Sequence, residues 1–320
     1  MRRLVLGFVA LAIVSAPLAQ GEGPLDETRI TLRQEVLRLI NNDRQGQGLA
    51  PVSLDLETSA VADAYCRNQI ANGTTGHFTI DNLAPYMRYS FAGGNDGVSE
   101  NAAAWSANYR FSDRAVYEMA RRSEQAMMSE RPPHDGHRRT ILDPFATYVG
   151  IGLAWEKGEF RLAQEFIRRY VSWSRPLPRA AAADEPISGS GRPADGYRIE
   201  AISVHHEAIP EAITARVANA ISSYSLPEKR RDYLPRLRSY ASRRDDGTIH
   251  LMREEYSDGS RGDFTVGADG AFNFTVPLRE GPGIYTVVVW VTKKGDRSPI
   301  AASNISIRVD RPAHSFAGTR

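Results

Sequence analysis

The sequence predicts an α+β domain followed by an all-β domain. In the first half, helix-like stretches precede and separate two strand-like runs, a mixture typical of a layered α+β domain. In the second half, short runs rich in β-branched and aromatic residues alternate with polar turns, which predicts a β-sandwich, immunoglobulin-like by pattern alone. A stretch rich in Pro, Ala and Gly separates the two halves.

Five elements are expected in the first half. Apolar residues recur at three-and-four spacing from residue 30 to residue 43, and Gly46 ends this helix. The second helix is rich in alanine, and an Asn-Gly pair at residues 72–73 ends it. The expected elements are helices at residues 30–43, 56–71 and 112–130 and strands at residues 148–155 and 160–173.

The second half is organised by turns. Residues 175–196 have the Pro, Ala and Gly content of a semi-rigid linker. Beyond it, Asp-Gly pairs punctuate strand-like runs. Residues 227–244 interrupt that pattern and are interpreted as a helical or irregular insertion. The strands are expected at residues 248–252, 272–276, 285–291 and 304–309.

The composition is typical of a secreted globular protein. The chain has 320 residues, 42% apolar and 24% charged, enough for two domains. Two arginines and an apolar run to Ala16 predict a signal peptide cleaved after Gly21. Cleavage leaves 38 basic and 38 acidic side chains, so nucleic acid is not indicated as a partner. No transmembrane segment is expected in the mature chain, and Cys66, the only cysteine, is interpreted as a small buried side chain.

Four motifs occur in order between residues 30 and 173. They are Asn41-Asn42-Asp43-Arg44 with Gly48-Leu49-Ala50-Pro51, then Gly76-His77-Phe78-Thr79, then Ser99-Glu100-Asn101-Ala102, and finally Gly136-His137-Arg138 with Ile141-Leu142 and Val149-Gly150-Ile151-Gly152. Together they resemble the CAP superfamily of cysteine-rich secretory, antigen 5 and pathogenesis-related proteins, also called SCP-like, in its cysteine-poor bacterial form. The resemblance implies a three-layer α-β-α sandwich.

The expected domain boundaries combine the resemblance, for the CAP domain, with composition and pattern, for the rest of the chain. They are a signal peptide at 1–21, an N-terminal tail at 22–29, a CAP domain at 30–174, a linker at 175–196, a β-sandwich at 197–311 and a C-terminal tail at 312–320.

His77, Glu100 and His137 form the predicted site. The resemblance implies that they converge in a central cleft open to solvent, with Asn101 beside Glu100. Two imidazoles and a carboxylate suit Zn²⁺ or another divalent cation. The other interpretation is a hydrogen-bonded cluster that only braces the loops of the cleft.

The segment before His137 departs from the bacterial pattern, because it is longer and contains no Trp. A fourth member of the cluster is expected there, and the sequence does not decide between Glu124 and Glu130. His134, three residues before His137, is a further candidate metal ligand.

Little in the sequence indicates catalysis. It contains no Gly-x-Ser-x-Gly and no His-Glu-x-x-His, which disfavours a serine hydrolase and the helix-borne zinc site of proteases. A metal-dependent hydrolase of peptide or cell-wall bonds is the enzyme alternative, with His77, Glu100, His137 and Glu130 as candidate catalytic residues. Seven basic residues between positions 229 and 244 are interpreted as a solvated face, with contact to an anionic envelope polymer as the alternative.

The favoured function is non-catalytic and follows from the resemblance. It is extracytoplasmic binding of a small apolar, sterol-like or envelope ligand, or of a partner protein, through the cleft of the CAP domain. The ligand-contacting residues would be His77, Glu100, Asn101 and His137. A structural or adhesion protein that acts through its β-sandwich is the third hypothesis. The sequence does not indicate an oligomeric state.

Overall fold

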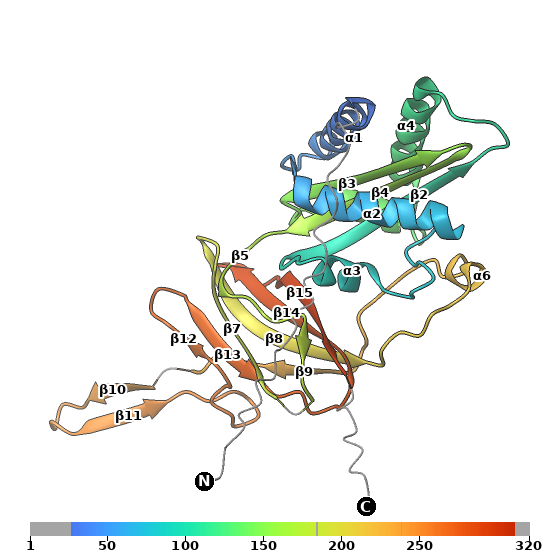
Figure 1. Ribbon diagram of the computed structural model, residues 1–320. Helices are drawn as coiled ribbons and strands as arrows, with labels where there is room; N and C mark the ends of the chain where they lie inside the picture. Colours follow the sequence, from blue (N-terminus) through green and yellow to red (C-terminus); the bar gives the residue numbers. More distant parts are fainter. Residues whose placement is uncertain (1–26, 184, 238, 311–320) are drawn as a thin grey trace, which may run out of the picture.

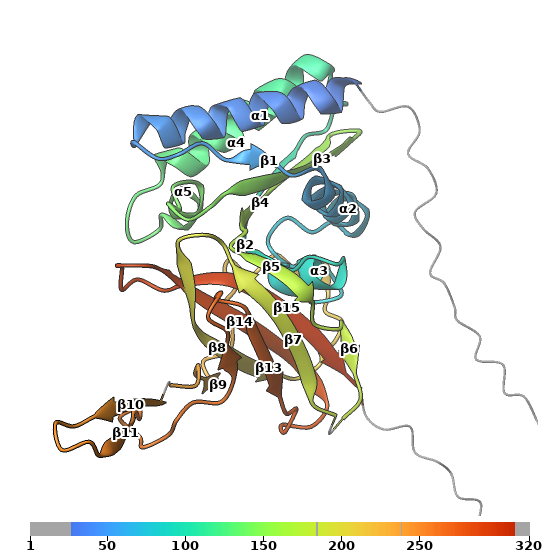
Figure 2. The ribbon, with the colours of Figure 1, turned by 90° about the vertical axis from the view of Figure 1, so that its left-hand side faces the viewer.

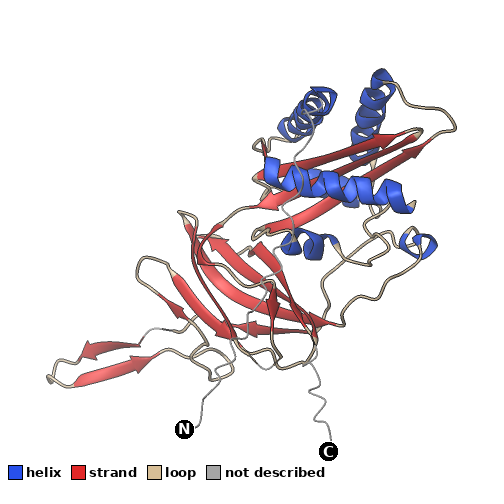
Figure 3. Ribbon diagram, in the orientation of Figure 1, coloured by secondary structure: helices blue, strands red, loops and turns tan. Residues whose placement is uncertain are grey.

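The computed structural model describes residues 27–310 except residues 184 and 238 (Figure 1). The predicted signal peptide and the predicted tail at residues 312–320 lie outside the described residues. An α+β region comes first along the chain, and a mostly β region follows it (Figure 3). Within the described part of the chain, no helix is both long enough and apolar enough to cross a membrane.

The N-terminal region has three layers. Its elements are α1 (Glu27–Gly46), β1 (Ser53–Leu54), α2 (Leu56–Asn72), α3 (Pro85–Phe91), β2 (Gly97–Ser106), α4 (Asp113–Ser129), α5 (Gly136–Ile141), β3 (Tyr148–Glu156) and β4 (Glu159–Arg168). The sheet has the order β1-β3-β4-β2, with only β1 and β3 parallel. Helices α1 and α4 cover one face and α2 covers the other (Figure 2). The expected helices and the first expected strand are confirmed.

Two glycines of the fourth motif allow α2 to lie close to the sheet. A Cβ on Gly150 would come within 2.5 Å of the Thr58 side chain, and one on Gly152 within 2.3 Å of the Ala62 backbone. Because no side chain at these positions would fit under α2, the Val-Gly-Ile-Gly pattern of β3 is a packing requirement.

The first motif holds the helical layer to the loop before β3. Arg44 is fully buried, and its guanidinium donates hydrogen bonds to the carbonyls of Ile141 and Asp143 at 2.7 and 2.9 Å. Asn41 exchanges two hydrogen bonds with the backbone of Val52, at 2.8 and 3.0 Å. The motif therefore satisfies backbone groups that burial would otherwise leave unpaired.

The described C-terminal region consists of two sheets around one core and a separate two-stranded sheet. Its elements are β5 (Val171–Arg175), β6 (Ala180–Ala181), β7 (Ile187–Pro193), β8 (Tyr197–Glu207), α6 (Ala215–Ala218), β9 (Arg230–Tyr233), β10 (Ser239–Arg243), β11 (Ile249–Arg253), β12 (Thr265–Val266), β13 (Phe272–Val276), β14 (Gly283–Lys293) and β15 (Ile300–Val309). One core sheet has the order β12-β13-β7-β5 and the other β6-β15-β14-β8-β9, and the separate sheet is β10-β11. Apolar side chains from both core sheets form a single cluster between them.

The segment predicted as a linker differs from that prediction, because it contains a central strand of the sandwich. β7 pairs with β13 on one side and β5 on the other. Its alternate residues face the core, and two of them are glycines. A Cβ on Gly189 would meet the Phe274 ring at 2.8 Å, and one on Gly191 would meet the Ser172 carbonyl at the same distance. The glycines that suggest a linker thus make room for core aromatic residues.

Two further expectations also differ from the structure. The strand expected at residues 160–173 is split: β4 ends at Arg168, and Val171 begins β5 in a different sheet. The segment at 227–244, interpreted as a helical or irregular insertion, contains β9 and β10. β10 pairs with β11 in a hairpin that projects from the sandwich (Figure 1).

The two regions share a packed junction. Side chains of α3 form an apolar cluster with Ile284 of β14, and Ser90 of α3 donates a hydrogen bond to the Asn304 carbonyl of β15 at 2.9 Å. Arg179, just before β6, reaches the carbonyls of Ser90 and Gly94 at 2.5 and 2.8 Å. The sandwich is therefore built against the N-terminal sheet and its helix α3.

Candidate functional site

His77 and Glu100 form a buried pair. His77 lies in the loop after α2, and Glu100 lies on β2. The Nδ1 atom of His77 is 2.9 Å from Oε1 of Glu100, and the Glu100 side chain has no exposed surface. Because a carboxylate only accepts, Nδ1 carries the proton, and Nε2 is the ring nitrogen left for other interactions.

Arg88 of α3 holds both members of this pair. Its guanidinium donates to Oε2 of Glu100 and, at 2.7 Å, to the backbone carbonyl of His77. It also stacks over the Tyr65 ring at 3.7 Å. Burial acts to raise the pKa of Glu100, but Arg88 and His77 outweigh it, so that the pKa lies below its ordinary value.

Glu165 of β4 lies opposite Glu100 in the sheet. Burial raises the pKa of Glu165 well above its ordinary value, and the neighbouring Glu100 charge raises it further. A protonated Glu165 can donate a hydrogen bond to the ionised Glu100. The pair thus carries one negative charge, which Arg88 neutralises.

His137 is hydrogen-bonded to Glu130, one of the two glutamates between which the sequence did not decide. Glu130 follows α4 and accepts hydrogen bonds from Nδ1 of His137 and, at 2.9 Å, from its backbone N–H. Glu124, one and a half turns earlier in α4, is buried instead and accepts from Gln164. Glu130 therefore belongs to the cluster that contains His137, whereas Glu124 lies in the buried interior next to this cluster.

Asn101 has an internal role rather than an exposed one. Its side-chain amide is buried and donates to the His137 carbonyl and to Gln164 Oε1, both at 3.1 Å. Gln164 in turn donates to Glu124. This chain of hydrogen bonds fixes the His137 backbone from the buried side of the site.

The two histidines come together. Their ring centroids lie 6.2 Å apart, with the ring planes 33° from parallel. The His137 side chain is 33% exposed, whereas that of His77 is only 10% exposed. Among the described residues, no group of three or more His, Cys, Asp or Glu side chains is arranged to hold a metal ion.

The surroundings of His77 are less open than the resemblance implies, because a segment from the sandwich packs against this side chain. This segment, residues 208–229, joins β8 to β9 and is called the strap (Figure 1). Tyr224 of the strap packs edge-on against the His77 ring at 4.9 Å, and its hydroxyl accepts a hydrogen bond from the Glu100 N–H at 2.6 Å. Asn219 of the strap accepts from the N–H of Thr75 at 2.9 Å.

A cavity of about 550 Å³ lies between the strap and α3. Tyr224 lines this cavity and also contacts His77, so it connects the cavity to the histidine pair. The lining is about equally polar and apolar: aromatic and aliphatic side chains are joined by two carboxylates, Glu207 and Glu211, and Glu207 accepts from the Tyr86 hydroxyl at 3.0 Å.

Two other candidates lie outside the cluster. His134 is exposed in a turn, and within the described residues no hydrogen bond or ion pair joins it to the histidine pair. Cys66 is fully buried in α2, and burial raises the pKa of its thiol well above the ordinary value. The expectation that Cys66 is a small buried side chain is confirmed.

Comparison with protein families identifies the N-terminal region. Residues 37–165 match the model of the cysteine-rich secretory protein family, CAP. This part of the chain is a CAP domain, which confirms the resemblance seen in its motifs.

Two solved structures are similar to parts of the chain. An extracellular protein containing a SCP domain from Bacillus anthracis str. Ames is 20% identical, with a TM-score of 0.33, over 47% of this chain and 45% of that one. Murine CRIg is 12% identical, with a TM-score of 0.21, over 44% of this chain and 99% of that one. The chain thus spans less than half of the Bacillus protein. No curated protein matches the sequence.

The sequence analysis missed Arg88, Glu165 and Tyr224. Glu165 does leave a signal, because it is an acid in the middle of a strand that is buried on both faces. A buried acid in such a strand needs a partner. Tyr224 leaves none, since it reaches the site from the other domain.

Proposed function

We propose that the protein is an extracytoplasmic binding protein that takes a small apolar ligand into the cavity between α3 and the strap. The observation that carries this proposal is the cavity itself, whose volume of about 550 Å³ falls in the range of small-molecule sites. Phe78, Tyr86 and Tyr224 would contact the apolar body of the ligand, and Glu207 would contact a polar group.

The polar side chains of the cluster already have partners within the protein, which supports a non-catalytic role. Both carboxylate oxygens of Glu100 are occupied, by His77 and by Arg88. Glu130 is occupied by His137, and the thiol of Cys66 is buried. These contacts favour the interpretation that the cluster braces the loops around the cavity.

Secretion is supported by the CAP domain and by the predicted signal peptide. The sandwich, which we interpret as immunoglobulin-like, would serve as a docking module and supplies the strap. A binding role for the sandwich alone would require a unit that includes β5 and β7 and therefore starts near Val171, not at residue 197.

Titration with the neutral fluorescent probe N-phenyl-1-naphthylamine tests the cavity. We expect saturable binding to the intact protein, and at least a tenfold loss of affinity in Phe78→Ala, because this ring lines the cavity. The matched control is Tyr109→Ala, which removes an aromatic ring that is 61% exposed and lies outside the cavity lining. Unchanged binding in Phe78→Ala, or no binding at all, would contradict the proposal.

A divalent cation is a second candidate, favoured by the orientation of the two imidazoles. In both rings Nδ1 is held by a carboxylate, the arrangement that commonly orients metal-binding histidines through Nε2. His77 and His137 would be the ligands, and Glu100 fits the role of an orienting partner better than that of a ligand. A bound cation would supply Lewis acidity.

Metal content after supplying zinc tests this candidate. We expect one Zn²⁺ per chain by mass spectrometry, and its loss in the His77→Ala/His137→Ala double variant. The control is His134→Ala/His206→Ala, which removes two histidines outside the pair and should retain the metal. Absence of zinc in the unmodified protein, or retention in the folded first variant, would exclude this pair as the site.

A further inference from the structure

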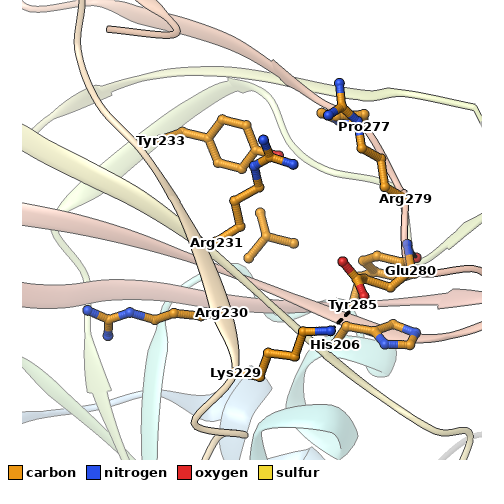
Figure 4. Close-up of a pocket in the computed structure, with 10 residues that line it drawn as sticks. His206, Lys229, Arg230, Arg231, Tyr233, Pro277, Arg279, Glu280 and Tyr285 are labelled. Carbon is orange, nitrogen blue, oxygen red and sulfur yellow. Dashed lines mark hydrogen bonds and ion pairs between the residues drawn. The ribbon is translucent and has the colours of Figure 1, made fainter. Parts of the chain in front are cut away.

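Side chains of strand β9 point alternately to its two faces. This alternation separates Arg230 from Arg231 in the basic run that begins at position 229. Arg230 and Asp232 point to one face, where the Arg230 guanidinium contacts Asp232 at 3.2 Å and lies over the Trp290 ring, although Arg230 also forms part of the lining of the pocket in Figure 4. Arg231 and Tyr233 point to the other face (Figure 4). Because side chains alternate along a strand, neighbouring arginines of one motif have different surroundings.

The face that carries Arg231 and Tyr233 forms one side of a pocket. Arg279, between β13 and β14, approaches from the opposite side (Figure 4). The buried residues of the lining are Val204, Tyr233 and Tyr285. Burial raises the pKa of Tyr233, whereas Arg231 and Arg279 act in the opposite direction, which places both charges near this side chain.

The charges in the pocket are unbalanced. Its one acid, Glu280, is paired with Lys229 at 3.0 Å. Neither Arg231 nor Arg279 forms an ion pair or a side-chain hydrogen bond with any other residue that the structure describes. Two guanidinium groups therefore face the pocket, next to the half-buried His206, without a described acid in direct contact. Lys229, the ion-pair partner of Glu280, lowers the pKa of this acid, and the Arg231 charge helps to lower it.

We propose that this pocket binds a phosphate- or sulfate-type oxyanion group between Arg231 and Arg279. Guanidinium groups recognise such oxyanions by paired charge-assisted hydrogen bonds. The volume of about 60 Å³ suits one such group, so the rest of the ligand would lie outside against the pocket rim. The site is distinct from the cavity of the CAP domain and does not depend on its function.

Inorganic phosphate and phenyl phosphate, followed by ³¹P NMR titration of the whole chain, test the site. We expect both to bind, and phenyl phosphate to bind more tightly because its ring can contact apolar surface at the rim. We expect Arg231→Gln and Arg279→Gln each to weaken binding at least fivefold. The matched control is Arg308→Gln on β15, whose guanidinium pairs with Asp310 at 2.8 Å and lies outside the pocket lining, so that binding should change less than twofold.

A polyphosphate chain distinguishes a free oxyanion from a repeating anionic polymer. Tighter binding per phosphate by the chain than by phenyl phosphate would identify the polymer as the source, provided that Arg308→Gln still has no effect. Equal losses in Arg308→Gln and Arg231→Gln would show only general surface charge and overturn the proposal. Absence of binding by all three probes, with circular dichroism showing folded protein, would also overturn it.

Discussion

Replacing Arg88 by Met is expected to lower the free energy of unfolding by about 3–5 kcal/mol at pH 7.5, the cost of leaving a buried charge without its partner. Among the residues that the structure describes, Arg88 is the one cation that contacts Glu100, apart from the His77 imidazole. Without it, the Glu100–Glu165 pair would hold a buried negative charge, and the His77 carbonyl would lose a hydrogen bond at 2.7 Å.

The loss should depend on pH with a definite sign. The pKa of Glu100 is lowered in the folded protein, so its contribution to stability is present above its ordinary pKa of about 4.5 and is lost as the pH falls below that value. In Arg88→Met, Glu100 can bind a proton instead of remaining charged. The deficit of the variant should therefore shrink between pH 7.5 and pH 4.5.

Urea unfolding at these two pH values measures the effect. The matched control is Arg122→Met, which breaks an ion pair with Glu118 at 2.8 Å on the surface of α4, where Arg122 is 55% exposed. Exposed pairs of this kind contribute less than about 1 kcal/mol. A loss for Arg88→Met no larger than for the control, or one that does not change with pH, would show that Glu100 does not need Arg88. The double variant Arg88→Met/Glu100→Gln should recover part of the loss, because it removes the charge together with its partner.

The sequence was sufficient to predict His77, Glu100 and His137 as a cluster because each lies within a short motif. It could not predict their partners, since these come from chain pairing at a distance. Glu165 faces Glu100 only through the register of β2 and β4. Tyr224 arrives from a different domain, 124 residues after Glu100 in the chain.

The dependence on residues that are distant in the chain also explains why the sequence predicts a linker at residues 175–196. Gly189 and Gly191 lower the apparent strand propensity of β7. At both positions, however, atoms of the neighbouring strands β13 or β5 occupy the space that a Cβ would need. The residues that require the glycines, Phe272 and Phe274, lie about 80 positions later. A local pattern therefore cannot distinguish this strand from a flexible segment.

The second large effect on stability is expected from replacing Glu124. It is 2% exposed, one of its carboxylate oxygens accepts from Gln164, and the other has no hydrogen-bond partner in the described part of the chain. Burial raises the pKa of Glu124 to about 8, and the charge of Asp43 adds to this. At neutral pH the folded protein therefore holds a neutral carboxylic acid beneath His137.

The sign follows from linkage. The pKa of Glu124 is higher in the folded chain than in the unfolded chain, so its contribution is fully present below about pH 4.5 and is lost as the pH rises to about 8. A shift of this size corresponds to about 4 kcal/mol across the window. Glu124→Gln keeps the shape and the acceptor for Gln164 but cannot ionise. The variant should match the unmodified protein near pH 4.5 and be more stable by about 4 kcal/mol at pH 8.5.

Unfolding in urea from pH 4.5 to pH 8.5 tests the expectation through the difference between the two proteins, which cancels the other titrating groups. Glu118→Gln, on the exposed face of the same helix, is the matched control. It removes only an exposed ion pair and should change the free energy of unfolding by less than about 1 kcal/mol. Parallel curves for Glu124→Gln and the unmodified protein would mean that Glu124 ionises as readily when folded as when unfolded. Water would then have to reach its unpaired oxygen, and the region beneath His137 would be hydrated rather than dry.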